Sequence, residues 1–387
     1  MTPNTTDTMS QIPIMRPWLG VEEQEAAAAA VASGWIAQGP RVAEFEAAFA
    51  TKLGAAHAVA VSSCTTALHL ALVVAGIDSG DEVVVPSLSF IATANAARYV
   101  NATPVFADVD IATANLTPAS VEAALTPATR AVIVVDQGGM PADVDAIRAL
   151  CEPRGISVVE DAACAAGSTY RGRPVGADAR LAAFSFHPRK ILTTGEGGMV
   201  VTSDDALAER MKLLRQHGMS MSAADRHAAG GAVIEQYLEV GFNYRMTDIQ
   251  AAVGIVQLGR LDQVVERRRL LADRYGVGLS GIDGLLLPAD PTWGTTNYQS
   301  YWVTLPEPIA GRRNDLMAVL AEQGISTRRG IMASHLEPAY AGHPHPDLPV
   351  TEQLTNGSII LPLFHEMTLE EQDRVIDAFR RALENLS

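Results

Sequence analysis

The sequence predicts an α/β protein: a large domain whose mostly parallel sheet is flanked by helices, and a smaller C-terminal α+β domain. From about residue 57 onward, short β-rich runs alternate with helical patterns, which is typical of a parallel sheet covered by helices. From about residue 281 the composition shifts towards Pro, Gly and Thr. The 387 residues are also enough for two domains.

The same patterns place the individual elements. Strands are expected at residues 57–61, 81–86, 103–110, 130–135, 156–160 and 181–186, followed by a hairpin around 195–203. Helices are expected at residues 66–76, 89–100, 141–155, 204–218 and 246–279. The C-terminal part should contain a strand at 301–306 and helices at 312–324 and 368–386. The helix at 246–279 is long enough to bridge two domains.

These elements suggest three parts. We expect a flexible tail at residues 1–12, and a large cofactor-binding domain at 13–255 that includes an N-terminal helical arm. A small domain at 256–387 should begin with the long bridging helix.

Composition narrows the possible partners and compartment. A net charge of -15 argues against nucleic acid, because Lys and Arg supply most of the affinity for phosphate backbones. Cys64, Cys151 and Cys164 have no C-x-x-C spacing, so we expect free thiols and no metal site. With no secretory signal pattern and no apolar run of about 18 residues, a cytoplasmic protein without a membrane span is expected.

Polar residues follow three of the predicted strands, where open α/β sheets bind ligands. Ser63, Cys64 and Thr65 open a helix, so their turn suits an anion, although Ser and Thr are also ordinary helix caps. Asp161 follows a buried strand, where the alternative is a structural carboxylate that caps a turn. Lys190 follows the sixth strand, where a partly desolvated amine loses its proton more easily; the alternative is a solvated lysine beside a Gly-Gly hairpin.

Together, an anion site, a buried carboxylate and a lysine are what pyridoxal phosphate (PLP) requires. The amine forms a Schiff base with the aldehyde, the helix N-terminus binds the phosphate, and the carboxylate keeps the pyridine nitrogen protonated. Patterning alone leaves open that the three residue types coincide by chance.

Six segments carry a resemblance to a known family. In order, they are SGWIAQGPRVAEFE, SSCTTALHLAL, SFIATANA, VVEDAACAAGSTYRG, FSFHPRKILTTGEGG and GFNYRMTDIQAAVG. This combination resembles the DegT/StrS-type nucleotide-sugar aminotransferases, which are PLP-dependent enzymes of the aspartate-aminotransferase-like fold type I. The resemblance runs from about Ile12 to the last helix. It implies a seven-stranded type of sheet in the large domain.

The resemblance also implies roles for residues around the cofactor. Lys190 would form the Schiff base and move the proton between substrate and cofactor carbons, and Asp161 would pair with the pyridine nitrogen. Phe90 would stack on the cofactor ring. The phosphate would be bound by the turn at Ser63, by backbone N–H groups of Cys64 and Thr65, and by the hydroxyls of Thr65 and Ser185. Asn243 would reach it from a neighbouring subunit, which implies a homodimer with shared active sites.

The chain departs from the family pattern at three places. Cys64 stands where Gly is usual, and it fits only if the backbone there avoids positive φ. Cys164 stands where Gln or His commonly contacts the ring hydroxyl, and a thiol is a poor hydrogen-bonding group. Asp136 and Gly138 stand where many relatives carry His and Tyr, near the expected substrate mouth. Of everything that the resemblance implies, the usual sugar substrate is the part that these departures bear on most.

Further residues are candidates for substrate contacts, each with a structural alternative. His187 either contacts substrate or cofactor phosphate, or is a hydrogen-bonded structural residue. Arg328, Arg329 and His335 either bind a substrate anion or are ordinary surface groups. The ERRR run at 266–269 lies on the long helix, where we expect a solvated face.

The expected function is the transfer of an amine from L-glutamate or a similar donor to a ketone. The ketone would be a keto-sugar linked to a nucleotide, or a related cyclic ketone. Such a step belongs to amino-sugar or secondary-metabolite biosynthesis. The first alternative is a PLP enzyme of another type, performing an elimination, dehydration or condensation, as Asp136, Gly138 and Cys164 suggest. Related dehydratases carry His in place of the lysine, so Lys190 argues against that branch. A non-catalytic regulator lacks support because no basic stripe is present, and no G-x-G-x-x-G follows a strand to indicate an oxidoreductase.

Overall fold

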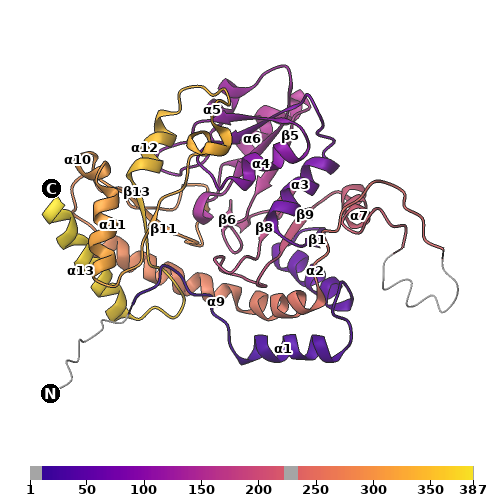
Figure 1. Ribbon diagram of the computed structural model, residues 1–387, viewed down its shortest axis with the longest axis horizontal. Coiled ribbons are helices and arrows are strands. Elements are labelled where there is room, and N and C mark those ends of the chain that lie inside the picture. The colour runs from indigo at the N-terminus through magenta and orange to yellow at the C-terminus, as the bar shows by residue number, and fades with distance from the viewer. Residues whose placement is uncertain (1–10, 222–233, 387) are drawn as a thin grey trace.

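The computed structural model describes residues 11–221 and 234–386 and is built around one large sheet (Figure 1). Its seven strands have the order β1-β9-β8-β5-β4-β2-β3. Their bounds are β1 His57–Val61, β2 Glu82–Pro86, β3 Thr103–Ala107, β4 Thr129–Val135, β5 Ser157–Asp161, β8 Ala182–Ser185 and β9 Gly198–Thr202. Strands β3, β2, β4, β5 and β8 pair in parallel, whereas β9 is antiparallel to both β8 and β1. The predicted mostly parallel sheet and its hairpin are therefore confirmed.

Helices cover both faces of this sheet. They are α2 Pro40–Leu53, α3 Cys64–Val74, α4 Ala92–Tyr99, α5 Pro118–Ala124, α6 Val144–Cys151 and α7 Asp205–Leu214, whereas α1 Val21–Ala32 packs on α9. Successive strand side chains point to opposite faces. Accordingly, Val59 and Val61 pack in a core with α3, α4 and α7, while Ala58 and Ala60 pack in a core with α2, α5 and α6. Because both faces are buried, the strands read as continuous apolar runs.

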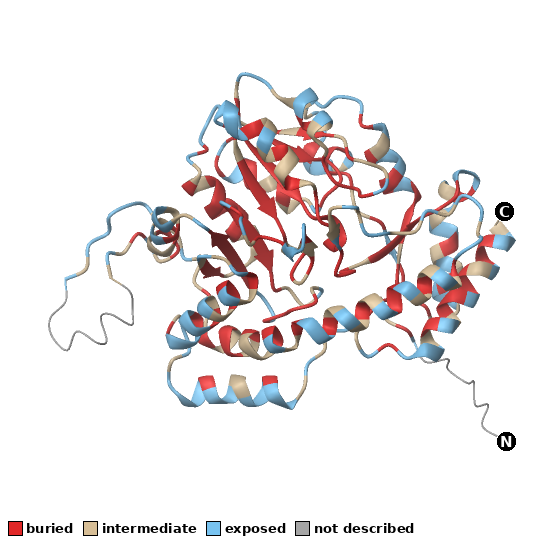
Figure 2. Ribbon diagram, turned by 180° about the vertical axis from the view of Figure 1, so that it is seen from behind, coloured by how far each residue is buried: buried red, intermediate tan, exposed pale blue. Residues whose placement is uncertain are grey.

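The long helix α9, Asp248–Gly278, follows the prediction closely. It begins at a capping box in which Thr247 accepts a hydrogen bond from the backbone of Gln250. Figure 1 shows α9 running beneath the sheet towards the C-terminal part, with α1 alongside it. Only Glu23 and Ala30 of α1 are buried, so most of this helix faces outwards (Figure 2).

The C-terminal part has its own antiparallel sheet, in the order β11-β13-β12. Its strands are β11 Tyr301–Thr304, β12 Arg328–Arg329 and β13 Ser358–Leu361, and its helices are α10 Glu307–Ala310, α11 Arg313–Glu322, α12 Pro349–Gly357 and α13 Leu369–Leu386. Leu316 and Phe379 contribute to a third core, which includes residues of α9. A small sheet joins β6 Thr169–Tyr170 and β7 Arg173–Pro174 to β10 Gly294–Thr295. Short 3₁₀ helices lie at η1 Gln137–Gly139, η2 Glu152–Arg154, η3 Ser334–Leu336 and η4 Pro338–Tyr340.

The N-terminal segment is anchored earlier than expected. Residues 1–10 of the predicted tail lie outside the described residues. Ile12 is buried, its N–H donates to the carbonyl of Gly324 at 2.8 Å, and its carbonyl accepts from the N–H of Ser326 at 2.9 Å. The division at residues 255 and 256 stays a prediction, and it falls inside α9. Across residues 11–221 and 234–386, no helix combines the length and apolarity needed to cross a membrane.

Candidate active site

The loops that follow β5 and β8 bring two of the predicted site residues together. These strands are parallel neighbours, with Asp161 in register with Ala183, so their carboxyl ends lie at the same edge. Lys190 lies in a turn in which its N–H donates to the carbonyl of His187 at 2.8 Å. Its Nζ reaches across to donate to the Sγ of Cys164 at 3.0 Å. The ammonium therefore points towards the loop after β5.

Asp161 is buried at the end of β5 and is held by one donor on each oxygen. Its Oδ2 accepts from the hydroxyl of Thr93 at 2.8 Å, and its Oδ1 accepts from the N–H of Ala163 at 3.2 Å. Burial raises the pKa of Asp161, while Thr93, Ala163 and the Lys190 ammonium act in the opposite direction. The carboxylate is thus fixed in place, and each oxygen retains a lone pair for a further partner.

The electrostatics of Lys190 differ from the expectation. Burial lowers its pKa, but Cys164, Cys64 and Asp161 raise it, and the net pKa lies above the ordinary value. Desolvation acts on Lys190 as predicted, since burial lowers the pKa of this amine, but it does not set the net direction. The groups beside the amine therefore act against the effect of burial on its pKa.

The N-terminus of α3 offers two free backbone donors. Ser63 is the N-cap, and its Oγ accepts from the N–H of Thr66 at 3.2 Å, so the capping alternative holds for this side chain. None of the described residues accepts a hydrogen bond from the N–H groups of Cys64 and Thr65. Cys64 starts the helix without positive φ, which is the condition under which a side chain fits there. Two N–H groups at a helix N-terminus suit an anion.

The Gly-Gly pair after Lys190 has a packing reason. A Cβ at Gly198 would lie 2.5 Å from the backbone carbon and oxygen of Ser63, and 2.7 Å from the nitrogen of Cys64. A Cβ at Gly197 would lie 2.4 Å from the hydroxyl of Thr194. Gly198 therefore lets β9 approach the start of α3, and Gly197 leaves room for the Thr194 hydroxyl.

Three other predicted cofactor residues have different surroundings. Ser185 is buried at the end of β8, and its Oγ accepts from the N–H of His187 at 3.5 Å. Phe90 follows β2 and is 65% exposed, so its ring is free to cover a ligand. Asn243 is exposed and bridges to Gln216 within its own chain.

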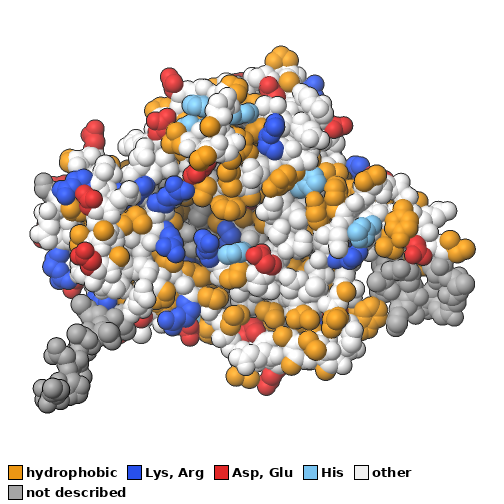
Figure 3. Space-filling view, viewed as in Figure 1, with side chains coloured by type: hydrophobic (Ala, Val, Ile, Leu, Met, Phe, Trp, Pro, Cys, Tyr) orange, Lys and Arg blue, Asp and Glu red, His pale blue; other side chains and the backbone are white. Residues whose placement is uncertain are grey.

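Two of the predicted substrate residues are accessible. The side chain of His187 is 40% exposed, and its Nδ1 accepts from the N–H of Arg189 at 3.1 Å. Burial is the main cause that lowers the pKa of His187. Arg329 is exposed and pairs with Glu337 at 3.0 Å. On the face shown in Figure 3, Lys and Arg side chains gather between α9 and the sheet, which suits an anionic ligand.

Asp136 and His335 do not lie where they were expected. Asp136 is only 1% exposed, and its Oδ1 accepts from the N–H of Ala142 at 2.9 Å, so it does not line an open mouth. His335 is also buried, with its Nδ1 at 2.7 Å from the hydroxyl of Ser87. Both side chains hold neighbouring loops, so neither is available to a substrate in this structure.

Gly138 has a spatial explanation as well. A Cβ at this position would lie 2.3 Å from the ring of Trp302, which comes from β11. Gly138 also has a φ of 57°, in the left-handed region that favours glycine. The indole of Trp302 thus fills the space that a side chain at residue 138 would take.

Several buried polar residues around the site were not predicted. Thr93 lies within one of the quoted segments, but nothing in the sequence links it to Asp161. Asn297 and Gln299 come from a region that the sequence shows only as Pro, Gly and Thr-rich. Arg268 belongs to the run expected to be solvated, yet it is only 2% exposed, so that expectation is wrong for this residue.

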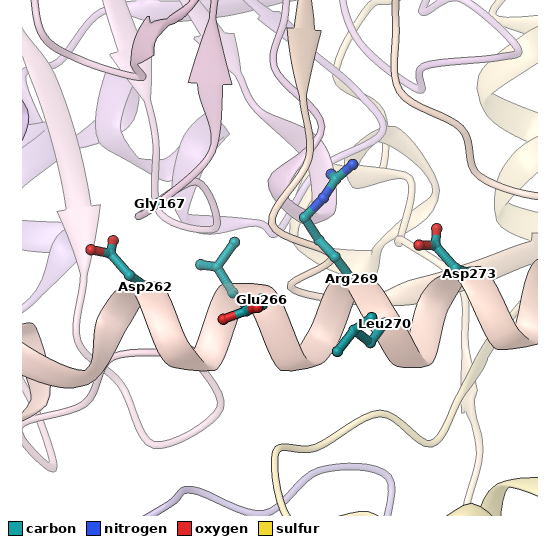
Figure 4. A pocket seen from close by; sticks show the side chains of 7 residues that line it. Gly167, Asp262, Glu266, Arg269, Leu270 and Asp273 are labelled. Atoms are coloured by element: carbon teal, nitrogen blue, oxygen red, sulfur yellow. The ribbon is translucent and has the colours of Figure 1, made fainter.

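A groove lies where α9 passes the loop at Gly167. It has a volume of about 470 Å³ and is lined by Gly167, Asp262, Val265, Glu266, Arg269, Leu270 and Asp273 (Figure 4). Its side chains include three carboxylates and one guanidinium, and none is a predicted site residue. It therefore adds no group to the candidate active site.

The donor set at the strand ends fits PLP. Lys190 supplies a primary amine, Asp161 a fixed carboxylate with spare acceptor capacity, and the start of α3 two unpaired N–H groups. The close approach that Gly198 permits keeps β9 and α3 together around this region. When bound, PLP supplies an aldehyde that links to amines and a ring that accepts electrons.

Comparison with known proteins shows which family this chain resembles. The model of the DegT/DnrJ/EryC1/StrS aminotransferase family matches residues 17–380. The spore coat polysaccharide biosynthesis protein SpsC of Bacillus subtilis (strain 168) is 40% identical over 374 residues, which cover 95% of this chain and 96% of SpsC. The aminotransferase TlmJ from Streptoalloteichus hindustanus is 39% identical, covering 97% of this chain and 99% of TlmJ with a TM-score of 0.89.

A third relative was solved with the cofactor. The PLP form of Spr1654 from Streptococcus pneumoniae is 28% identical, covers 97% of this chain and 100% of its own, and has a TM-score of 0.91. The predicted fold and cofactor are confirmed by these likenesses. The chain belongs to the DegT/DnrJ/EryC1/StrS aminotransferase family and is a PLP-dependent transaminase.

Proposed function

We propose that this transaminase moves an amine from L-glutamate to a keto-sugar that is carried on a nucleotide. The observation that carries the proposal is the meeting of Lys190 and Asp161 at adjoining strand ends, next to the free N–H groups of α3. The sugar acceptor is supported by the resemblance of six segments to nucleotide-sugar aminotransferases and by the role of SpsC in polysaccharide biosynthesis. Amino-sugar biosynthesis is the proposed setting.

In this proposal each cofactor-facing residue has a defined role. Lys190 would hold the aldehyde of PLP through Nζ and would also serve as the base that moves the proton between carbons. Asp161 holds a proton on the ring nitrogen, and Phe90 covers one ring face. Cys64 and Thr65 bind the phosphate.

The remaining proposed contacts are less central. Ser185 adds a hydroxyl to the phosphate site, and Ser63 keeps the α3 amides in position by capping the helix. His187 and Arg329 are proposed substrate contacts because both are accessible. The buried Asp136 and His335 are left out of the substrate site.

The test is the near-visible absorbance of the purified protein before and after L-glutamate is added. We expect a band from PLP bound to Lys190, and its loss on adding glutamate as the amine passes to the cofactor. Lys190→Ala is the control, and adding glutamate to this variant should not produce the same loss of absorbance. If glutamate leaves the band of the wild-type protein unchanged while a keto-sugar is consumed by elimination or dehydration, amine transfer is refuted.

We also propose a homodimer whose active sites share residues. Asn243 would bind the phosphate in the site of the partner, which its exposed position permits. The test mixes two variants, Lys190→Ala and Asn243→Ala, after each has been dissociated in mild denaturant. If Asn243 acts across the interface, mixed dimers contain one intact site, and about a quarter of the wild-type activity returns. If it acts within its own chain, both sites of a mixed dimer stay defective and nothing returns.

A further inference from the structure

The segment at residues 296–299, between β10 and β11, is a buried stretch that reaches the candidate active site from the C-terminal part. Asn297 is 0% exposed and Gln299 is 7% exposed. Their side chains form hydrogen bonds almost entirely with backbone groups of loops that follow β5 and β8. We call residues 296–299 the anchor segment.

Gln299 binds the peptide groups on both sides of Lys190. Its Oε1 accepts from the N–H of Ile191 at 3.0 Å, and its Nε2 donates to the carbonyl of Arg189 at 2.6 Å. One side-chain amide therefore satisfies a donor and an acceptor that flank the lysine. Because an unpaired buried peptide group is costly, these two bonds fix the backbone from which the Lys190 side chain leaves.

Asn297 makes the corresponding bonds to the loop after β5. Its Nδ2 donates to the carbonyls of Cys164 and Ala166, both at 2.8 Å, and its Oδ1 accepts from the N–H of Gln299 at 2.7 Å. Gly139 gives it room, since a Cβ there would lie 1.9 Å from that Oδ1. The anchor segment thus joins the Lys190 loop to the Cys164 loop.

Arg268 of α9 holds the anchor segment from the other side. Its guanidinium donates to the carbonyls of Tyr298 and Gln299, both at 2.8 Å, and to the carbonyl of Leu363 at 3.0 Å. These acceptors are all backbone carbonyls, so the cation fixes backbone position and leaves the Gln299 side chain free to bind residues 189 and 191. The chain of contacts runs from α9 through Gln299 to the lysine.

We propose that Gln299 is a positioning residue for Lys190. The lysine side chain is flexible, and its Nζ has only a weak thiol acceptor in Cys164, so its position depends on the backbone that carries it. Gln299 supplies that rigidity without touching the reacting atoms. The inference rests on the proposed role of Lys190, but the position of the loop is measured separately from that role.

The test replaces Gln299 by Met, which keeps the length of the side chain and removes both hydrogen bonds. Hydrogen exchange of the peptide covering residues 187–194 is followed in the full chain, with PLP bound and with PLP dialysed out. We expect exchange at Ile191 to rise about tenfold or more in both states, because its N–H loses its acceptor. In the loaded enzyme, the pH midpoint of the cofactor absorbance should shift by about half a unit or more, and amine transfer should slow about 10- to 100-fold.

Gln372→Met is the matched control, since Gln372 is also buried and its Nε2 donates to the carbonyl of Leu271 at 2.6 Å, in α9. It should change neither the exchange of 187–194 nor the absorbance midpoint. If Gln299→Met does not fold, Gln299→Asn, which is one methylene shorter, should show the same changes in weaker form.

The proposal is overturned if exchange at 187–194 and the absorbance midpoint stay as in the wild type in the variant that folds. It is equally overturned if Gln372→Met gives the same changes. A wild-type protein that fails to accept glutamate would refute the proposed donor, whereas the exchange result would still decide whether Gln299 holds the loop.

Discussion

Two buried polar regions of this chain lie side by side and are built in opposite ways. At the strand ends, Lys190 has one weak acceptor and Asp161 has one donor on each oxygen. In the anchor region, Arg268 has three carbonyl acceptors and Gln299 binds with both ends of its amide. The first region keeps hydrogen-bonding capacity for a ligand, and the second uses its capacity within the chain.

The strand ends are therefore suited to binding a ligand, and the anchor region is suited to holding the backbone rigid. A group that is to receive a cofactor must tolerate burial with few partners, and burial accordingly raises the pKa of Asp161. Burial lowers the pKa of Arg268 to about 9, which still leaves the guanidinium charged at neutral pH. We therefore expect substitutions at the strand ends to reduce activity more than stability, and substitutions in the anchor region to do the reverse.

The largest expected effect is that of Asp161→Asn on amine transfer. An amide cannot hold a proton on the ring nitrogen as a carboxylate does, so the rate constant with L-glutamate should fall about 100- to 1,000-fold. The measurement is the single-turnover loss of the cofactor absorbance. A fall of less than about threefold would show that Asp161 is not the partner of the nitrogen.

The stability of the same variant sharpens the contrast. Because the pKa of Asp161 is raised on folding, its ionised form costs stability as pH rises above the ordinary carboxyl pKa. With PLP dialysed out, Asp161→Asn should therefore unfold in urea at the same or a higher concentration than the wild type at pH 7. The two proteins should converge at a pH below the ordinary carboxyl pKa, where both forms are neutral. A clear loss of stability at pH 7 would contradict this.

The sequence predicted the strand-end region much better than the anchor region, for a physical reason. Lys190 and Asp161 follow strands whose apolar runs are visible in the sequence, so their position at one edge followed from the topology. Gln299 and Arg268 bind backbone carbonyls, which every residue has, so no pairing of residue types marks them.

The misplaced residues have the same origin. The resemblance implied Asp136 near the substrate mouth, and His335 was a candidate contact for a substrate anion, but Ala142 and Ser87 hold them within the protein. Whether such a side chain is buried or accessible depends on contacts between distant parts of the chain. The order of strands and helices needed no such information, because hydrophobic periodicity reflects burial directly.

Arg268→Met should give the largest loss of stability. It leaves three carbonyls without their donor, and we expect the free energy of unfolding to fall by about 3 kcal/mol. Arg274→Met on the same helix is the control; its side chain is 37% exposed and pairs with Asp373, so its loss should stay below about 1 kcal/mol. Urea unfolding measures both. Equal losses in the two variants would show that the anchor region is not specially rigid.

Gly198→Ala tests the contact between β9 and α3 that borders the strand-end region. The added Cβ would lie 2.5 Å from backbone atoms of Ser63, which cannot move as a side chain can. We expect a loss of about 2 kcal/mol in the free energy of unfolding and weaker PLP binding by about tenfold. Gly259→Ala in α9, where a Cβ meets nothing within 4 Å, should instead add about 0.5–1 kcal/mol. Unchanged PLP affinity in Gly198→Ala would mean that this contact does not shape the phosphate site.

The smallest expected effect concerns Glu160, which precedes Asp161 in β5 and points to the other face of the sheet. Burial raises the pKa of Glu160 from 4.5 to about 7, although Arg148 at 3.7 Å acts against this. Between these two pH values the folded chain binds more protons than the unfolded chain, so this group reduces stability as pH rises from 4.5 to 7. Glu160→Gln removes that dependence.

At pH 8 we expect the Gln variant to be more stable than the wild type by about 1 kcal/mol, since the loss of the Arg148 partner offsets part of the gain. At pH 4.5 the difference should vanish, because the wild-type side chain is then largely protonated in the folded state. Glu122→Gln, at an exposed residue that pairs with Arg154, is the control and should change the free energy of unfolding by less than about 0.5 kcal/mol. A Glu160→Gln variant that is less stable at pH 8 would mean that this carboxylate is held by its partner as firmly as Arg268 is by its carbonyls. Fully paired buried charges would then be found on the opposite face of the sheet as well, at the residue that precedes Asp161.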